Sequence, residues 1–399
     1  MSTTGKTLAR GDRVAGYNLE EIEARLESCE GISGVCKTDL PTPSLLLDLD
    51  LFEANVETMA RHAASRSIGM RPHSKTHKCP EVARRQMAAG ALGISTATVS
   101  EAETMARAGI TGLLITSEMA DPNKFQRLVR LTRRHPDTMA VVDHPWQAEQ
   151  MNEAAAAGGV QLNIMLDIDP ANRRTGIEAG QPALRLAREV DRLSNLNLKG
   201  VHCYCGKSSH VHGFEERWRH SQESMAAPLE TFSRMRQEGL PVEIFSGCST
   251  GTYNIDSEIE GITEMQAGSY VFMDLDYMRI GGRGGDVYDD FDPALTVLST
   301  VTSRNLSSQA TLDAGLKAFS TDRAFGPRPV GIDGAGFRWG GDEHGILTLE
   351  TAGADVRLGD KLEFYPPHCD PTVNLYDRIY CTRGDQVVEV WPILARGHR

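Results

Sequence analysis

The chain has 399 residues, which is too long for one small domain and leaves room for a (β/α)8 barrel of roughly 250 residues and a second domain. Hydrophobic residues make up 40% of the chain and charged residues 24%, and no apolar run approaches the ~20 residues that a membrane-spanning helix needs. The net charge of -12 would repel the phosphates of nucleic acid, so the composition is compatible with an enzyme for small molecules and argues against nucleic-acid or membrane partners.

Residues 1–42 form an N-terminal arm whose sequence predicts only irregular or partly helical structure. The arm lacks the apolar core of a signal peptide, so we expect a cytoplasmic protein. The eight cysteines show no CxxC pair, which is typical of reduced thiols. A strand is expected at 44–49, upstream of the barrel strands, and we expect it to pair with the C-terminal domain.

Strand-like and helix-like segments alternate between residues 43 and 285. Strands that alternate with helices predict a parallel sheet, and eight such units predict a closed barrel. We therefore predict an α/β fold built on a TIM-like (β/α)8 barrel. Its strands are expected at Ile68–His73, Leu92–Ala97, Leu113–Ser117, Met139–Asp143, Leu162–Asp169, Leu198–Gly206, Val242–Gly247 and Ala267–Met273.

The texture changes at about residue 286, where the sequence becomes rich in short strand-like runs, Gly and Pro. Residues 286–399 are therefore expected to form a second, all-β domain. Its strands are expected at Leu295–Ser303, Gln309–Asp313, Gly345–Glu350, Lys361–Tyr365 and Val387–Trp391.

The run RPHSKTHK at residues 71–78 ends the first expected barrel strand and places Lys75 among other cationic groups. A neighbouring positive charge disfavours the protonated form of a lysine, and a neutral amine can form a Schiff base with an aldehyde. Read alone, such a run is more often a solvated basic loop. Its position favours a site, because barrel active sites lie at the C-terminal ends of the strands. Lys75 is thus a candidate anchor for pyridoxal phosphate.

Small and hydroxyl residues follow strands seven and eight, where barrels often bind phosphate. Small residues let backbone N–H groups approach a phosphate, and hydroxyl groups add donors. Either run alone could be an ordinary turn, but both together with Lys75 predict a cofactor site. The candidates are Ser249, Thr250, Gly251 and Thr252 in SGCSTGT, and Gly268, Ser269 and Tyr270 in QAGSY.

Two further groups follow strands five and six. Arg174, in the run Asn172–Gly176, could hold the phenolic oxygen of the cofactor or a substrate carboxylate with its planar donors. Tyr204 could pack on the cofactor ring. His210 lies where a general base would be useful, although a lone histidine is more often structural.

The C-terminal domain carries His368 and Asp370 two residues apart, in PPHCDPT. In an extended segment these side chains share one side, with Cys369 turned away, and offer one nitrogen and one oxygen ligand. Two protein ligands leave positions open for water and substrate, which is a catalytic arrangement rather than a structural one. Oxygen and nitrogen ligands suit Mn²⁺ or Mg²⁺, while Zn²⁺ or Co²⁺ stays possible.

With these motifs assembled, the chain from about Thr42 to Arg399 resembles the D-threonine aldolase family, pyridoxal phosphate enzymes that share the alanine racemase barrel with eukaryotic D-serine dehydratase. RPHSKTHK resembles the cofactor-lysine motif, and the runs named above resemble the arginine turn, the ring-contacting tyrosine and the phosphate segments. By the resemblance, His210 acts near the β-hydroxyl, and His368 and Asp370 hold the metal. Asp370 stands where dehydratase-like members tend to carry cysteine, which favours an aldolase.

The resemblance implies cleavage of D-β-hydroxy-α-amino acids to glycine and an aldehyde, by a homodimer. Departures from the family pattern at Cys205, Lys207–Ser209 and Asp274–Asp292 put the substrate in doubt. One alternative is aldol cleavage or dehydration of D-3-hydroxyaspartate, with Arg279 or Arg283 holding the second carboxylate. Others are a non-enzymatic protein that binds pyridoxal phosphate and, more weakly, alanine racemase, which needs no metal.

Overall fold

The computed structural model describes residues 35–349 and 355–398, which form two compact units. One unit contains residues 56–270 and 279–290 with the C-terminal residues from 397, and the other contains the described residues up to 55, 271–278 and 291–396. The expected N-terminal arm falls mainly on residues 1–34, outside the described part of the chain.

The first unit contains a sheet of parallel strands that closes on itself. Hydrogen bonds from the Leu92 N–H to the Met70 carbonyl (2.7 Å) and from the Ser95 N–H to the Pro72 carbonyl (2.9 Å) join its first two strands, and a parallel bridge pairs His73 with Ser95. The predicted barrel is confirmed. In spatial order the strands are β3 (Gly69–Met70), β11 (Glu264–Met265), β10 (Ile244–Gly247), β9 (Leu196–Cys203), β7 (Leu162–Asp169), β6 (Met139–Val142), β5 (Leu114–Ile115) and β4 (Ser95–Thr96), with β8 (Ile177–Glu178) beside β7.

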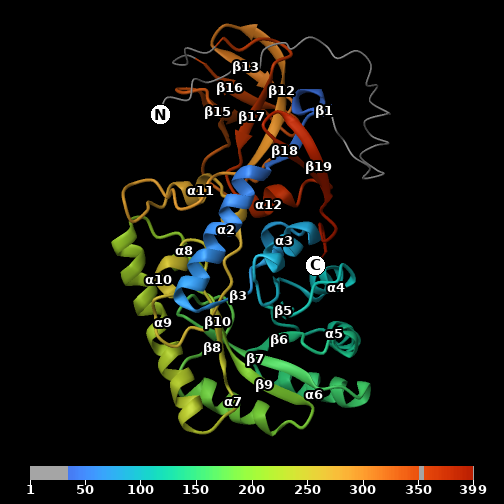
Figure 1. Cartoon of the computed structure of the whole chain (residues 1–399), viewed down its shortest axis with the longest axis vertical. Helices are drawn as coiled ribbons and strands as arrows, with labels where there is room; N and C mark the ends of the chain where they lie inside the picture. The colour runs from blue at the N-terminus through green and yellow to red at the C-terminus, as the bar shows by residue number, and fades with distance from the viewer. Residues whose placement is uncertain (1–34, 350–354, 399) are drawn as a thin grey trace. The chain divides into compact units, whose positions relative to one another are not determined.

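Helices follow these strands around the outside of the barrel (Figure 1). Their ends carry local stop and start signals: the Asp121 carboxylate caps one helix by accepting from the Asn123 N–H (2.9 Å), and Gly159 ends another in the left-handed conformation. The helices are α2 (Leu49–Arg66), which enters from the other unit, α3 (Pro80–Ala88), α4 (Val99–Arg107), α5 (Pro122–Arg134), α6 (Pro145–Gly158), α7 (Gln181–Arg192), α8 (Gly206–Ser209), α9 (Phe214–Gln237) and α10 (Tyr253–Asp256).

The position predicted for the eighth strand is wrong. The strand is β11, and the apolar residues of Ala267–Met273 instead enclose the 3-10 turn η3 (Ser269–Val271). The short strand carries Glu264, whose charge hides it from a hydrophobicity pattern. This carboxylate is buried because Arg71 on the neighbouring strand binds it with two hydrogen bonds, of 2.9 and 2.7 Å.

The second unit is built on a mixed sheet in which Leu45 of β2 pairs antiparallel with Val297 of β12, and Leu46 pairs parallel with Tyr380 of β18. Phe319, Phe337 and Phe364 pack edge to face at about 6 Å in its core. The elements are β1 (Val35–Cys36), β2 (Ser44–Asp48), α11 (Leu275–Met278), β12 (Leu295–Leu306), β13 (Gln309–Leu312), β14 (Arg328–Pro329), β15 (Gly336–Trp339), β16 (Gly345–Thr348), β17 (Lys361–Tyr365), α12 (Cys369–Val373), β18 (Arg378–Arg383) and β19 (Gln386–Pro392), with the turn η1 (Lys37–Asp39).

The predicted β-rich class of the C-terminal domain is thus confirmed, although the sequence pattern missed β18, a central strand of its sheet. β18 reads RIYCTR, and its charged ends resemble a turn. Within the described part of the chain, none of the helices has the length and apolar character that a bilayer crossing requires.

Candidate active site

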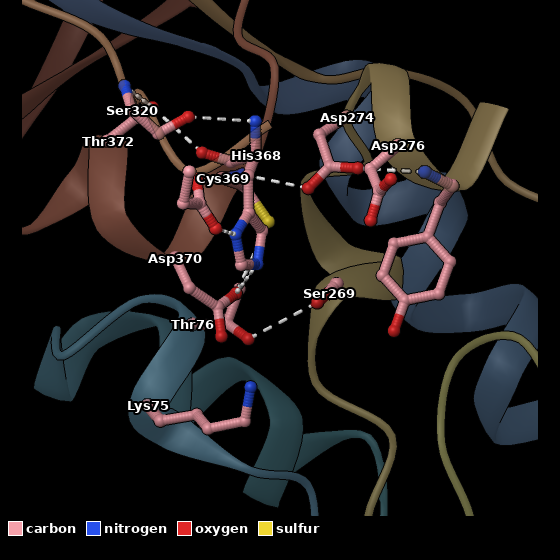
Figure 2. A network of polar contacts seen from close by, with 12 residues as sticks. Lys75, Thr76, Ser269, Asp274, Asp276, Ser320, His368, Cys369, Asp370 and Thr372 are labelled. Carbon is pink, nitrogen blue, oxygen red and sulfur yellow. Dashed lines mark hydrogen bonds and ion pairs between the residues drawn. The ribbon is translucent and has the colours of Figure 1, made fainter. Parts of the chain in front are cut away.

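Lys75 lies just beyond β3, in the 3-10 turn η2 (Ser74–Thr76). The His73 ring fixes this turn, because its Nδ1 accepts from the Lys75 N–H (3.2 Å) and its Nε2 is 2.9 Å from the Thr116 Oγ1. The lysine side chain is half-buried and extends from the turn (Figure 2). The lysine therefore stands at the C-terminal edge of the barrel, where the sequence predicts it.

The two cations that flank Lys75 are both neutralised. Arg71 is paired with the buried Glu264, and the Lys78 Nζ lies 2.9 Å from the carboxylate of Glu101, whose side chain is fully buried. A charge that is already paired repels a neighbouring ammonium less. The electrostatic reason for singling out Lys75 is therefore weaker than the sequence suggests, and its position at the strand end carries the assignment.

The segment after β10 forms a buried loop with unused donors. The Thr252 hydroxyl donates to the Asp256 carboxylate (2.5 Å) and accepts from the Ser249 N–H (3.2 Å), so it is turned toward the protein. Among the described residues, the N–H groups of Thr250 and Gly251 have no hydrogen-bond partner, although both residues are buried. Buried N–H groups are rarely left unpaired. Such a pair is what a phosphate group would satisfy.

Two glycines bring other candidate segments close to this loop and to Lys75. A Cβ on Gly251 would lie 2.1 Å from the Ser209 carbonyl, and a Cβ on Gly268 would lie 2.7 Å from the His73 carbonyl. The Ser209 hydroxyl is buried and has no partner among the described residues. Sequence reasoning missed Ser209, and its position beside the loop makes it a further candidate donor.

The second predicted phosphate segment is joined to the first. The Tyr270 N–H donates to the Thr250 Oγ1 (3.0 Å), and the Tyr270 hydroxyl accepts from the Gln86 Nε2 (3.1 Å). The Ser269 Oγ lies 3.5 Å from the Thr76 Oγ1, directly after Lys75 (Figure 2). These contacts place Gly268, Ser269 and Tyr270 between the lysine turn and the loop.

The candidate residues Arg174 and Tyr204 lie next to each other. The guanidinium carbon of Arg174 lies 5.3 Å from the centre of the Tyr204 ring, within range of a cation–π interaction. His210 ends the short helix α8, where its N–H donates to the Lys207 carbonyl (3.2 Å), and it is half-buried, whereas His212 is exposed.

A buried acid and base pair near these residues was not predicted. The Asp167 Oδ1 on β7 lies 2.5 Å from the His202 Nδ1 on β9, and the strand register pairs the two residues. Burial and the adjacent Asp167 raise the pKa of Glu118 to about 8. Burial also acts to raise the pKa of Asp167, but attraction to His202 outweighs it and the pKa is lowered. Charged residues at matching positions of two buried strands are the signal that could have found this pair.

In the other unit, His368 and Asp370 face one another, with 4.0 Å between the His368 Nε2 and the Asp370 Oδ1. The reason differs from the one predicted. His368 alone is extended, and Asp370 is the second residue of helix α12, so the helix start brings the two side chains together. Cys369 is buried, and its Sγ lies 3.4 Å from the Asp370 Oδ1, so it is not turned away from the pair as expected.

Asp322 orients the histidine, and the sequence did not indicate it. Its Oδ2 lies 2.7 Å from the His368 Nδ1 and 2.6 Å from the Arg323 Nη1. Because the Nδ1–H is held by a carboxylate, the Nε2 lone pair remains available on the side of Asp370. The backbone beneath is also fixed, since the buried Asp274 accepts from the Cys369 N–H (2.8 Å).

Comparison with known proteins decides the family. A family model described as alanine racemase, N-terminal domain, matches residues 47–276, and one described as putative serine dehydratase domain matches residues 294–382. A D-threonine aldolase of Arthrobacter sp is 36% identical over 357 residues, which cover 89% of this chain and 93% of that protein. The chain belongs to the D-threonine aldolase family.

Two further likenesses agree with this family. A 3-hydroxy-D-aspartate aldolase of Paracoccus denitrificans (strain Pd 1222) is 35% identical over 369 residues, covering 92% of this chain and 95% of that protein. The crystal structure of a D-threonine aldolase from Filomicrobium marinum superposes with a TM-score of 0.87 at 39% identity, covering 90% of this chain and 97% of that chain. The family inferred from the motifs is thereby confirmed.

The residues present fit the two groups that membership of the D-threonine aldolase family implies. The lysine at the strand end and the unpaired N–H groups of Thr250 and Gly251 fit pyridoxal phosphate. One imidazole nitrogen and one carboxylate oxygen fit a divalent ion that keeps open positions. No cluster of three or more His, Cys, Asp or Glu side chains suited to a metal occurs in the described ranges.

Proposed function

We propose that this protein is a metal-dependent pyridoxal phosphate aldolase that cleaves D-β-hydroxy-α-amino acids of the D-threonine type to glycine and an aldehyde. The observation that carries the proposal is the pair His368 and Asp370, with the Nε2 of one turned toward the Oδ1 of the other. An oxygen ligand at this position supports aldol cleavage over dehydration. The identity to D-threonine aldolase and 3-hydroxy-D-aspartate aldolase supports the same class.

Each residue has a defined task in this proposal. When bound, pyridoxal phosphate supplies an aldehyde for the substrate amino group and a ring that withdraws electrons from Cα, and a divalent ion supplies a Lewis acid for the β-hydroxyl. Lys75 holds the cofactor, and Arg174 and Tyr204 orient it. His210 takes the proton from the β-hydroxyl oxygen, so that the Cα–Cβ bond can break and leave a carbonyl at Cβ. His368 and Asp370 hold the ion, which we expect to be Mn²⁺ or Mg²⁺.

A second candidate substrate is D-3-hydroxyaspartate, because a relative 35% identical to this chain is named for it. Its second carboxylate would need a cation. Arg283 is partly engaged, since it lies 3.6 Å from Glu258 and 4.7 Å from the centre of the Phe214 ring. Arg279 is exposed. A rise in KM for D-3-hydroxyaspartate alone, in Arg279→Ala or Arg283→Ala, would identify the carboxylate contact.

The proposal is tested by incubating the purified protein with D-threonine and Mn²⁺ and measuring glycine and acetaldehyde. Chelation should abolish both products while the fold and the bound cofactor persist, because two ligands make a catalytic metal site and not a folding site. Unfolding on chelation would indicate a structural metal. Equal turnover of L-threonine, or turnover that ignores the chelator, would contradict the proposal.

A further inference from the structure

Arg217, on helix α9, is a fully buried arginine whose hydrogen bonds all go to main-chain carbonyls. It donates to Gly251 (2.8 Å), Val211 (2.9 Å), Ile280 (3.0 Å) and Gly281 (2.7 Å). One of these carbonyls belongs to the loop with unpaired N–H groups, and another follows His210 directly. The side chain therefore fastens the loop and the histidine segment to the same point.

The charge of Arg217 has no carboxylate bound to it within the described residues. Its guanidinium is flanked by aromatic rings, 5.6 Å from the centre of Tyr288 and 5.9 Å from that of Phe214. Asp290 acts on it only at a distance, and the Asp290 carboxylate is bonded to Tyr253 and Asn254, each at 2.9 Å. Burial lowers the pKa of Arg217. A buried charge without a partner is costly, and proteins rarely retain one without a compensating charge.

The loop of residues 248–252, which Arg217 contacts through the Gly251 carbonyl, is where a bound anion would compensate this charge. The Gly251 carbonyl points to the guanidinium, while the N–H groups of Thr250 and Gly251 are unpaired and suited to an anion. The anion and the guanidinium would then act on the same loop without direct contact. We propose that Arg217 is the buried counter-charge of the cofactor's phosphate group. The inference rests on the proposed function, in that residues 248–252 take the phosphate.

The test separates the charge of Arg217 from the set of hydrogen bonds that its planar guanidinium group donates. Arg217→Lys keeps the charge and loses this set of hydrogen bonds, and Arg217→Gln loses both. Arg219→Gln is the control, because Arg219 lies on the same helix, is exposed, and pairs with Glu216 at 2.6 Å. For each protein, freed of cofactor, the affinities for pyridoxal phosphate and for pyridoxal are measured, and their ratio reports the contribution of the phosphate. Thermal melting with and without inorganic phosphate gives a second readout.

We expect the affinity ratio to fall on the order of tenfold or more in Arg217→Gln, because a charge acting through several ångströms of protein contributes at least that much. Arg217→Lys and Arg219→Gln should keep the wild-type ratio, and inorganic phosphate should stabilise both. If the role of Arg217 were purely structural, both Arg217 variants would bind pyridoxal phosphate and pyridoxal more weakly to the same extent. The affinity ratio would then stay unchanged, and this result would overturn the inference.

If Arg217→Gln does not fold, Arg217→Lys decides alone. Near-wild-type affinities for both pyridoxal phosphate and pyridoxal in that variant, with an unchanged ratio, support the counter-charge, whereas a reduced ratio, or binding of both compounds weakened alike, overturns it. Wild-type protein that binds no pyridoxal phosphate would refute the proposed function itself, whereas a strong wild-type preference for the phosphorylated vitamer that survives in Arg217→Gln refutes only the role of Arg217.

Discussion

Replacing Asp322 by alanine tests whether His368 is held for metal binding. In the wild type, the Asp322 Oδ2 lies 2.7 Å from the His368 Nδ1, so the carboxylate fixes the orientation and the tautomer of the ring and leaves the Nε2 as the ligand atom. Loss of such an outer partner typically costs about 10- to 100-fold in metal affinity, or about 1.4 to 2.7 kcal/mol. We expect Asp322→Ala to weaken Mn²⁺ binding by this amount, and Asp322→Asn by less, because an amide oxygen can still accept.

The same substitution should leave the fold nearly unchanged. The Asp322 side chain is 40% exposed, and an exposed ion pair contributes at most about 1 kcal/mol. Its other partner, Arg323, keeps a contact of 2.9 Å with Asp276. Mn²⁺ affinity is measured by calorimetric titration and stability by thermal melting. Asp355→Ala is the control, because it breaks a fully exposed pair with Arg357 in the same unit. Wild-type Mn²⁺ affinity in Asp322→Ala would refute the reasoning.

Three further predictions concern the barrel unit. Lys75→Ala should lose the visible absorption of the bound cofactor, and borohydride reduction of the wild type should label Lys75; labelling of Lys78 would redirect the assignment. His210→Ala should lose on the order of 10²–10⁴ in turnover but still bind the cofactor, whereas the exposed His212→Ala should stay near wild type, and the reverse result would move the base to His212. Burial raises the pKa of Asp256 from 3.8 to about 6. Between these two pH values the folded protein keeps a proton on Asp256 that the unfolded chain releases. The wild type therefore loses stability as the pH rises through this window. Asp256→Asn removes this pH dependence. Its free energy of unfolding, measured with urea below and above the window, should rise relative to that of the wild type by up to about 3 kcal/mol as the pH increases. A difference between the two proteins that stays constant with pH would contradict the pKa shift.

The features that the sequence predicts well are those set by neighbouring residues. Alternating strands and helices predict the barrel, because each unit is coded within a short stretch. The glycine and hydroxyl run at 248–252 and the position of Lys75 at a strand end are local in the same sense. His368 and Asp370 are two residues apart, so their proximity was predictable even though the predicted extended backbone was wrong.

The features that the sequence does not predict depend on partners far along the chain. Glu264 hides the last barrel strand until Arg71, 193 residues away, is seen to neutralise it. Asp322 is 46 residues from the histidine it orients. Arg217 reads as one of many charged residues on an amphipathic helix, and its burial is decided by the loops that pack over it. A charged residue is assigned to the surface by default. Buried pairs of polar residues are therefore the features that a single sequence does not reveal.

The most direct test of the proposed aldol cleavage is the mass of the product formed in heavy water. With D-threonine and Mn²⁺ in D₂O, breaking the Cα–Cβ bond leaves Cα to be reprotonated from solvent, so the account predicts acetaldehyde together with glycine that carries one deuterium at Cα. Formation of ammonium and a 2-oxo acid without glycine would show dehydration instead, and would contradict the aldolase assignment.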